Sequence, residues 1–103
     1  MARLKLNPEP TFKAKVGIPV PGSRPADVLF TFKHRTRDDV IAWVEGSREQ
    51  NDVESVLACV VGWDLDDEFN AENVERLCNN YPGSGLTIVA AYLDELRGAR
   101  AKN

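Results

Sequence analysis

The sequence predicts an α+β fold that is mostly α-helical, with an N-terminal β-hairpin followed by about four helices. Between residues 11 and 33 apolar and polar residues alternate, as in half-buried strands. From residue 36 onward the apolar residues recur at helical spacing. With 103 residues the chain suits a single domain. We expect a flexible arm over 1–10, one domain over 11–98 (hairpin 11–33, helical part 36–98) and a basic tail over 99–103.

The hairpin is predicted from two alternating segments with a proline-rich loop between them. Residues 11–18 and 26–33 place their apolar side chains at every second position: Phe12, Ala14, Val16 and Ile18, then Val28, Phe30 and Phe32. The three prolines within residues 19–25 exclude a sheet interior, so this segment should form the connecting loop. Because an isolated hairpin is only marginally stable in water, we expect it to pack on the helices.

Capping residues and glycines set the expected boundaries of the helices. The first three helices are predicted to begin at side chains that can accept a hydrogen bond from a free N–H group: Thr36, Asn51 or Asp52, and Asn70. Three glycines are predicted to end helices: Gly46, Gly62 and Gly98. The second helix has the clearest helical spacing of apolar residues: Val53, Val56, Leu57, Val60 and Val61.

The last two helices are predicted from one apolar face each. The third should bury Val74, Leu77, Cys78 and Tyr81. The fourth should run from somewhere within residues 82–86 to about Arg97. Its predicted inner face consists of Leu86, Val89, Ala90, Leu93 and Leu96 or Arg97, with Ile88 and Tyr92 beside it.

The two cysteines are expected to be reduced core residues. Cys59 and Cys78 both fall on apolar faces of predicted helices, and a disulfide between those helices is the less favoured alternative. The first residues lack the apolar segment of a secretory signal, and no apolar run approaches the roughly 20 residues of a membrane span. We therefore expect a cytoplasmic protein that does not enter a membrane.

Charge is strongly separated along the chain. Residues 1–37 carry eight Lys or Arg and two Asp or Glu, a net charge of +6. Residues 38–96 carry two Arg and fourteen Asp or Glu, a net charge of −12, and residues 97–103 add +3. The basic segment can fold against the acidic one and neutralise it, or the separation can serve self-association or a partner.

An acidic loop with three large apolar side chains is predicted between the second and third helices. Trp63, Leu65 and Phe69 alternate there with four acidic residues, Asp64, Asp66, Asp67 and Glu68. Large apolar residues in a loop either pack onto the core or form a binding hot spot. The stretch also resembles a calcium loop, but Phe69 occupies the sixth position, where a sharp turn requires glycine. A solvated acidic loop is therefore favoured over a metal site.

Other chemistries have weaker support in the sequence. The single histidine, His34, has no nucleophile motif near it, so no catalytic site is expected. Gly83-Ser84-Gly85 lacks the lysine of a phosphate-binding loop. The basic residues near Phe12, Phe30 and Phe32 suggest a nucleic-acid strip, but a pI of about 5.1 and the core pattern of these aromatics oppose it. We expect no cofactor, metal or nucleic acid.

Several stretches together resemble the tail assembly chaperone family of long-tailed bacteriophages. They are the run from Phe30 to Asp39, Trp43, the sequence GWDLDDEFN at residues 62–70, NYPG at 80–83, and AYLDEL at 91–96. The resemblance covers roughly residues 26–103 and is most specific between residues 62 and 83.

The resemblance implies a binding protein with no catalytic residues. Members of this family bind the long helical tape measure protein, keep it soluble and help tail tube subunits polymerise around it. They act in the cytoplasm of the infected or lysogenic bacterial host, tend to self-associate, and are absent from the mature virion. The alternatives are another small phage morphogenesis protein, such as a tail or head–tail completion factor, and a cytoplasmic adaptor without a phage link.

The expected partner surface is the acidic loop, with the outer face of the last helix around Tyr92. The residues that we assign to it are Trp63, Asp64, Leu65, Asp66, Asp67, Phe69 and Tyr92. A protein that keeps a helical partner soluble needs exposed apolar side chains on a charged body, and this loop supplies both.

Overall fold

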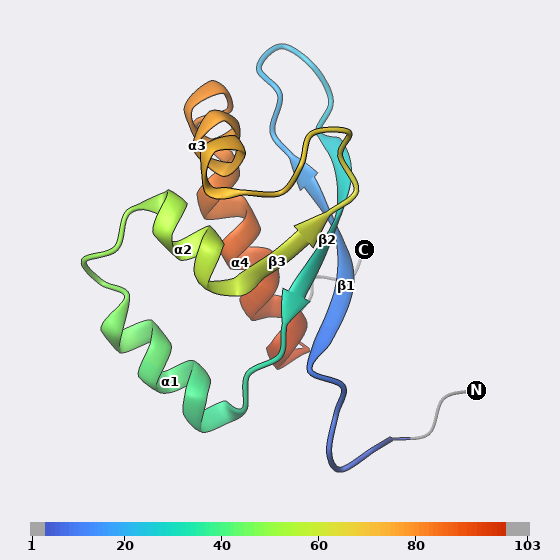
Figure 1. The fold of residues 1–103 in the computed structure, drawn as a ribbon, viewed down its shortest axis with the longest axis vertical. Helices are drawn as coiled ribbons and strands as arrows, with labels where there is room; N and C mark the ends of the chain where they lie inside the picture. Colours follow the sequence, from blue (N-terminus) through green and yellow to red (C-terminus); the bar gives the residue numbers. More distant parts are fainter. Residues whose placement is uncertain (1–3, 99–103) are drawn as a thin grey trace.

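The fold is a three-stranded antiparallel sheet with four helices on one of its faces, and a computed structural model describes it for residues 4–98 (Figure 1). The elements in chain order are β1 Thr11–Ile18, β2 Ala26–Lys33, α1 Arg37–Gly46, α2 Asp52–Cys59, β3 Val60–Trp63, α3 Ala71–Asn80 and α4 Ser84–Arg97. The predicted α+β class is confirmed, but the sheet extends beyond the hairpin to residue 63. The basic tail, residues 99–103, lies outside the described residues.

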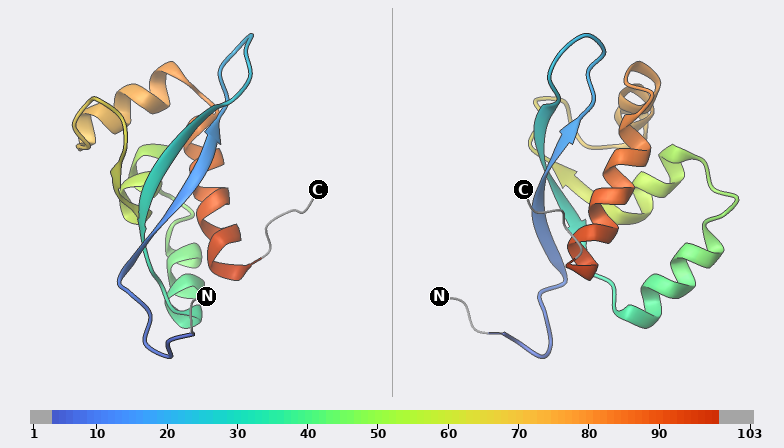
Figure 2. Two further views of the ribbon diagram at one scale, coloured as in Figure 1. Left: turned by 90° about the vertical axis from the view of Figure 1, so that its right-hand side faces the viewer. Right: turned by 180° about the vertical axis from the view of Figure 1, so that it is seen from behind.

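The hairpin pairs as the alternation predicts. β1 and β2 run antiparallel in continuous register, from Thr11 opposite Lys33 to Ile18 opposite Ala26. Their apolar positions face the helices, whereas Lys13 and Lys15 are exposed on the other face of β1. In Figure 2 the helices all lie on one side of the sheet and leave its other face uncovered.

The second helix is shorter than predicted, because residues 60–63 form a strand. α2 ends at Cys59, and β3 pairs antiparallel with β2 through Val60 opposite Phe32 and Trp63 opposite Phe30. A run of β-branched residues fits a strand as well as a helix, and an unpaired edge of β2 would leave its backbone groups without partners. The pairing therefore outweighs the helical spacing of Val60 and Val61.

The predicted N-terminal caps of the first three helices and the end of α4 at Gly98 are confirmed, whereas Gly62 lies in β3 and does not end α2. The side chains of Thr36 and Asn70 accept hydrogen bonds from the N–H groups three residues later, at 3.1 and 2.8 Å. At α2 the cap is Asn51, which forms a reciprocal capping box with Glu54. Gly98 ends α4 with a φ of +67°, a conformation that glycine adopts without steric cost.

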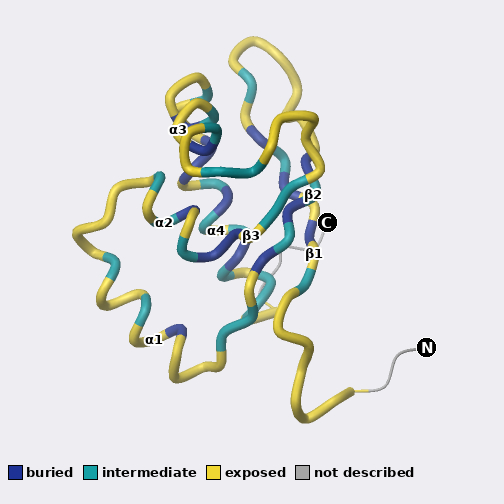
Figure 3. Tube along the Cα trace, viewed as in Figure 1, coloured by how far each residue is buried: buried dark blue, intermediate teal, exposed yellow. Residues whose placement is uncertain are grey.

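The core lies between the sheet and helices α2, α3 and α4 (Figure 3). Its fully buried members include Phe30, Phe32, Val56, Val74 and Ile88. Both cysteines are buried free thiols, which confirms the predicted core positions. Helix α1 is peripheral, and Val40 is its buried residue.

Helix α4 is rotated relative to its predicted orientation. Its buried positions are Ser84, Gly85, Ile88 and Tyr92, whereas Leu86, assigned to the inner face, is 78% exposed. Apolar residues surround much of this helix, so its spacing alone does not define one inner face. The close approach to α2 decides the orientation: a Cβ at Gly85 would lie 2.7 Å from the Cβ of Asp52. Only glycine fits at this contact.

Candidate partner-binding surface

The acidic loop, residues 63–69, joins β3 to α3 and is anchored to the sheet at its start. The Asp64 carboxylate accepts a hydrogen bond from the N–H of Leu29 at 3.0 Å. In return the Asp64 N–H donates to the Leu29 carbonyl at 3.1 Å. Asp64 therefore extends the pairing with β2 by one residue and fixes the direction in which the loop leaves the sheet.

Two of the three large apolar residues of the loop pack onto the domain. The rings of Trp63 and Phe69 meet edge to face with centroids 5.1 Å apart, and Trp63 also packs on Phe30 at 6.4 Å. The Trp63 Nε1–H donates to the Asp67 carbonyl at 2.7 Å, and the Asn73 amide donates to the Glu68 carbonyl at 2.7 Å. These contacts hold the loop in one conformation. Of the two expected alternatives, packing onto the core therefore applies to Trp63 and Phe69, which are half-buried.

Leu65 is the apolar side chain that the loop leaves at the surface. It is 38% exposed, and the four acidic residues around it are also exposed: Asp64, Asp66, Asp67 and Glu68. A cavity of about 250 Å³ lies beside Leu65, between the loop and α3. Its walls include Trp63 and Leu65 on the loop side and Arg76, Leu77 and Tyr81 on the α3 side. The arrangement can hold an apolar side chain within a polar rim.

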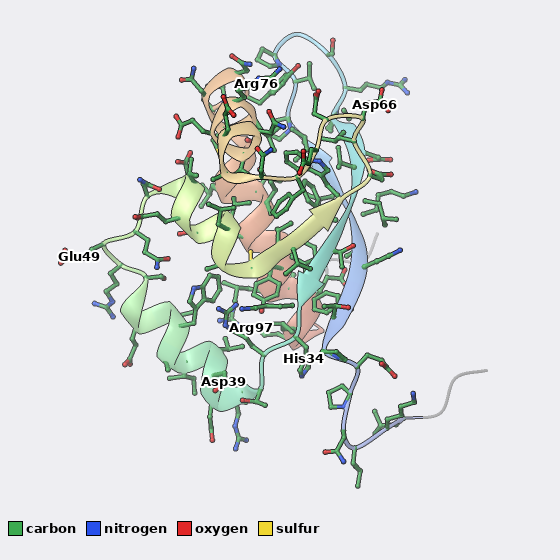
Figure 4. The ribbon with its side chains drawn as sticks, in the orientation of Figure 1. His34, Asp39, Glu49, Asp66, Arg76 and Arg97 are labelled. Atoms are coloured by element: carbon green, nitrogen blue, oxygen red, sulfur yellow. The ribbon has the colours of Figure 1, made fainter. Side chains whose placement is uncertain are left out.

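Sequence reasoning missed the contribution of α3 to this surface. Leu77 and Tyr81 were correctly placed on its apolar face, but they are only half-buried and reach the cavity. Arg76 donates to the Asn73 side chain at 2.7 Å, which holds a cation next to the acidic loop. In Figure 4, Asp66 and Arg76 both lie in the upper part of the molecule. The spacing of residues 73, 76, 77 and 80 on one helix was the available signal.

Tyr92 does not belong to the exposed surface, which corrects its predicted position. Its side chain is completely buried and stacks on Phe32 with ring centroids 5.3 Å apart. Its hydroxyl donates to the Lys33 carbonyl at 2.8 Å and accepts a hydrogen bond from Arg35 Nη1 at 3.1 Å. The Arg35 guanidinium lies 4.5 Å from the centroid of the Trp43 ring. Tyr92 thus joins α4 to the end of β2, and a partner cannot reach it in this structure.

The nucleophilic groups of the core are not activated. Burial raises the pKa of the Cys59 thiol to about 12 and that of Cys78 to about 11. Burial also raises the pKa of Tyr92, and the hydrogen bond from Arg35 opposes this shift. Since the thiolate is the reactive form of cysteine, both thiols are inert at neutral pH.

Basic and aromatic residues of the hairpin do not form the alternating strip considered for nucleic acid. Phe30 and Phe32 are fully buried under the helices, while Lys13, Lys15 and Lys33 are exposed on the opposite face of the sheet. Stacking on bases needs exposed rings beside the cations, which this arrangement does not provide.

The described part of the chain is residues 4–98. There, no three His, Cys, Asp or Glu side chains come close enough together to hold a metal ion. None of the helices in this range has both the length and the apolar character that crossing a membrane requires.

Comparison with known proteins gives a match at the level of a family. A family model described as phage tail assembly chaperone matches residues 1–103, which is the whole chain. Neither curated proteins nor solved structures give a match.

Proposed function

The chain belongs to the phage tail assembly chaperone family, and from this premise we propose that it binds the tape measure protein, keeps it soluble and promotes tail tube polymerisation around it. The family is one of assembly chaperones and not of enzymes. The finer assignment follows the resemblance of residues 26–103 to chaperones of long-tailed phages. Its site of action in this proposal is the cytoplasm of the infected or lysogenic bacterial host.

The observation that carries the proposal is the exposure of Leu65 on a loop with a fixed conformation. The loop is held at both ends by hydrogen bonds of Asp64 and Asn73, and it needs little further ordering when a partner binds. Leu65 and the neighbouring cavity offer an apolar contact, and the surrounding carboxylates keep this surface soluble. We assign the partner surface to Trp63, Asp64, Leu65, Asp66, Asp67 and Phe69.

Co-expression with the tape measure protein of the same genome tests the proposal. The tagged chain is expected to bring the tape measure protein into the soluble fraction and to co-purify with it. Leu65→Ser should lower the recovered tape measure protein by at least about fivefold, since an anchor in a contact contributes more than 1 kcal/mol. Leu86→Ser is the matched control, because Leu86 is 78% exposed and lies outside the loop.

The choice of Leu65 as the target keeps an effect on binding separate from an effect on folding. Trp63 is unsuitable as a first target because its ring supports the core through Phe30. A tape measure protein that stays insoluble beside the soluble wild-type chain would reject the proposal. Equal recovery with Leu65→Ser and wild type would reject the loop as the contact surface but leave the binding function standing.

The proposal also predicts where the protein is absent. A chaperone of this kind leaves the particle when the tail is complete, so purified virions should contain none of it. Stoichiometric copies in virions, measured by mass spectrometry, would instead favour a tail or head–tail completion protein. Binding to the tail tube protein is part of the same proposal and is tested by adding that protein to the co-purified complex.

Self-association is the remaining part of the proposal. Residues 1–37 have a net charge of +6, whereas residues 38–96 have a net charge of −12. Opposite charges on separate surfaces favour contacts between copies that use different surfaces. Light scattering at increasing protein concentration measures this association directly.

A further inference from the structure

A second surface, distant from the acidic loop, lies between the start of α1 and the end of α4. It encloses a groove of about 430 Å³ with apolar side chains from both helices: Val40, Ile41 and Leu96. Ile41 is 54% exposed, more than Val44, the other exposed large apolar residue of α1. The groove is therefore an apolar surface that residues 4–98 leave open to solvent.

The groove is basic, in contrast to the rest of the helical side. Three arginines line it, Arg35, Arg37 and Arg97, and none of the described residues that line it is acidic. Arg37 and Arg97 are exposed, and Arg37 makes a long contact of 3.7 Å with the equally exposed Asp38. Arg35 is held in place by its hydrogen bond to Tyr92. The groove therefore presents positive charge around an apolar centre.

From these features we infer that the groove of one copy receives the acidic loop of a second copy. The loop has the complementary composition, because Leu65 is exposed between four carboxylates. Leu65 would contact Ile41 and Leu96, while the carboxylates around it would face Arg37 and Arg97. The inference rests on the self-association part of the proposed function and names the two surfaces that meet.

The positions of the two surfaces support a head-to-tail contact. In Figure 4, Asp66 lies in the upper part of the molecule, and His34 and Arg97 lie in the lower part, along the longest axis. The molecule measures 41 Å along this axis. A contact between two different surfaces of the molecule continues from copy to copy, and it forms a ring if the rotation closes and a chain if it does not.

Charge also directs the loop to the groove in preference to the neighbouring helical surface. Residues 38–96 have a net charge of −12, so most of that surface repels a second acidic loop. The uncovered face of the sheet is also basic, with alternating lysines on β1, but β1 and β2 contribute none of the exposed large apolar side chains of the described residues. The groove combines positive charge with a hollow for Leu65. A contact of one loop with one groove is small, and its association is correspondingly weak and sensitive to salt.

Two variants and their mixture test the inference with the full chain. The groove variant is Arg37→Glu with Ile41→Glu, and the loop variant is Leu65→Ser with Asp66→Lys. Each should weaken self-association at least about tenfold and run near the monomer mass of 11.4 kDa, as measured by light scattering at low salt. The groove variant keeps an intact loop, and the loop variant keeps an intact groove. An equimolar mixture should therefore form dimers of about 23 kDa and nothing larger.

Control variants distinguish loss of association from loss of folding, and they test surfaces other than the loop and the groove. Glutamate at position 37 stands in the first turn of α1, where the helix dipole favours negative charge, so the groove variant should remain folded. Leu86→Glu, on an exposed apolar residue outside both surfaces, should associate like wild type. Lys13→Glu with Lys15→Glu tests the face of the sheet and should also leave association nearly unchanged.

Four results would overturn the inference. They are a wild-type chain that stays monomeric at millimolar concentration, a folded groove variant that associates like wild type, a mixture that gives no dimer, and loss of association with the sheet variant alone. The tape measure protein is tested in a separate co-expression experiment, so either proposal can fail while the other stands.

Discussion

Replacing Tyr92 with phenylalanine tests the most consequential departure of the structure from the sequence pattern. The change removes one oxygen atom and keeps the ring that stacks on Phe32. In the structure this oxygen is completely buried and joins α4 to Lys33 and Arg35 through two hydrogen bonds. On an exposed helix face the same substitution would change stability little, because water would replace the hydrogen bonds of the hydroxyl.

The expected loss of stability follows from the groups left behind. Without the hydroxyl, the Lys33 carbonyl loses the donor of a part-buried hydrogen bond, and an acceptor left without a partner beside the core costs about 1–3 kcal/mol. Arg35 is only half-buried and can turn toward water, so its contribution is smaller. We expect the free energy of unfolding to fall by about 2 kcal/mol. In a domain of this size that lowers the melting temperature by about 8–16 °C.

Urea unfolding, followed by tryptophan fluorescence and circular dichroism, measures this difference. Tyr81→Phe is the matched control, since Tyr81 is only half-buried, and it should change stability by less than about 0.5 kcal/mol. Tyr92→Ala, which also removes the stacked ring, should cost about 3–5 kcal/mol. A Tyr92→Phe variant that unfolds within about 0.5 kcal/mol of wild type would refute the buried position of the hydroxyl.

Two individual contacts and the burial of Cys59 lead to four further predictions. Gly85→Ala should lower the free energy of unfolding by about 1–3 kcal/mol, because the new Cβ would lie 2.7 Å from the Cβ of Asp52. Alanine favours helices more than glycine does, so without this contact the variant would be more stable. A stabilised variant in urea unfolding would therefore contradict the contact. With a pKa raised from 9.0 to about 12, Cys59 should have roughly a thousandfold less thiolate at pH 8 than in the unfolded chain, so alkylation followed by mass spectrometry should be slow until urea is added. The raised pKa of Cys59 also means that the folded state is stabilised relative to the unfolded state fully below pH 9, and that this stabilisation is lost as the pH rises toward 12. An unfolding midpoint that does not fall between pH 9 and 12 would argue against it. Asp64→Ala should cost about 1 kcal/mol by freeing the Leu29 N–H, and it should lower recovery of the tape measure protein by loosening the loop, as measured in the co-expression assay.

The hairpin and the helix starts could be predicted because their signals are local. Alternation within residues 11–33 depends on neighbouring positions alone, and the side-chain caps of Thr36, Asn51 and Asn70 reach only three residues along the chain. The acidic loop was identified for the same reason, since its composition differs from the segments on either side. Its assignment as a partner surface stays a prediction.

The sequence by itself therefore determined the fold class, the two paired strands, the helix caps and the acidic loop. Tertiary structure decided the rest: β3 exists because the edge of β2 needs a partner, and Leu65 is exposed because Trp63 and Phe69 fill the space below the loop. The orientation of α4 was decided by Asp52 against Gly85 and by the partners of Tyr92, which lie 57 and 59 residues away in the sequence. A helix with apolar residues on several sides carries no local signal for such distant contacts, so only the packed domain selects the face that is buried.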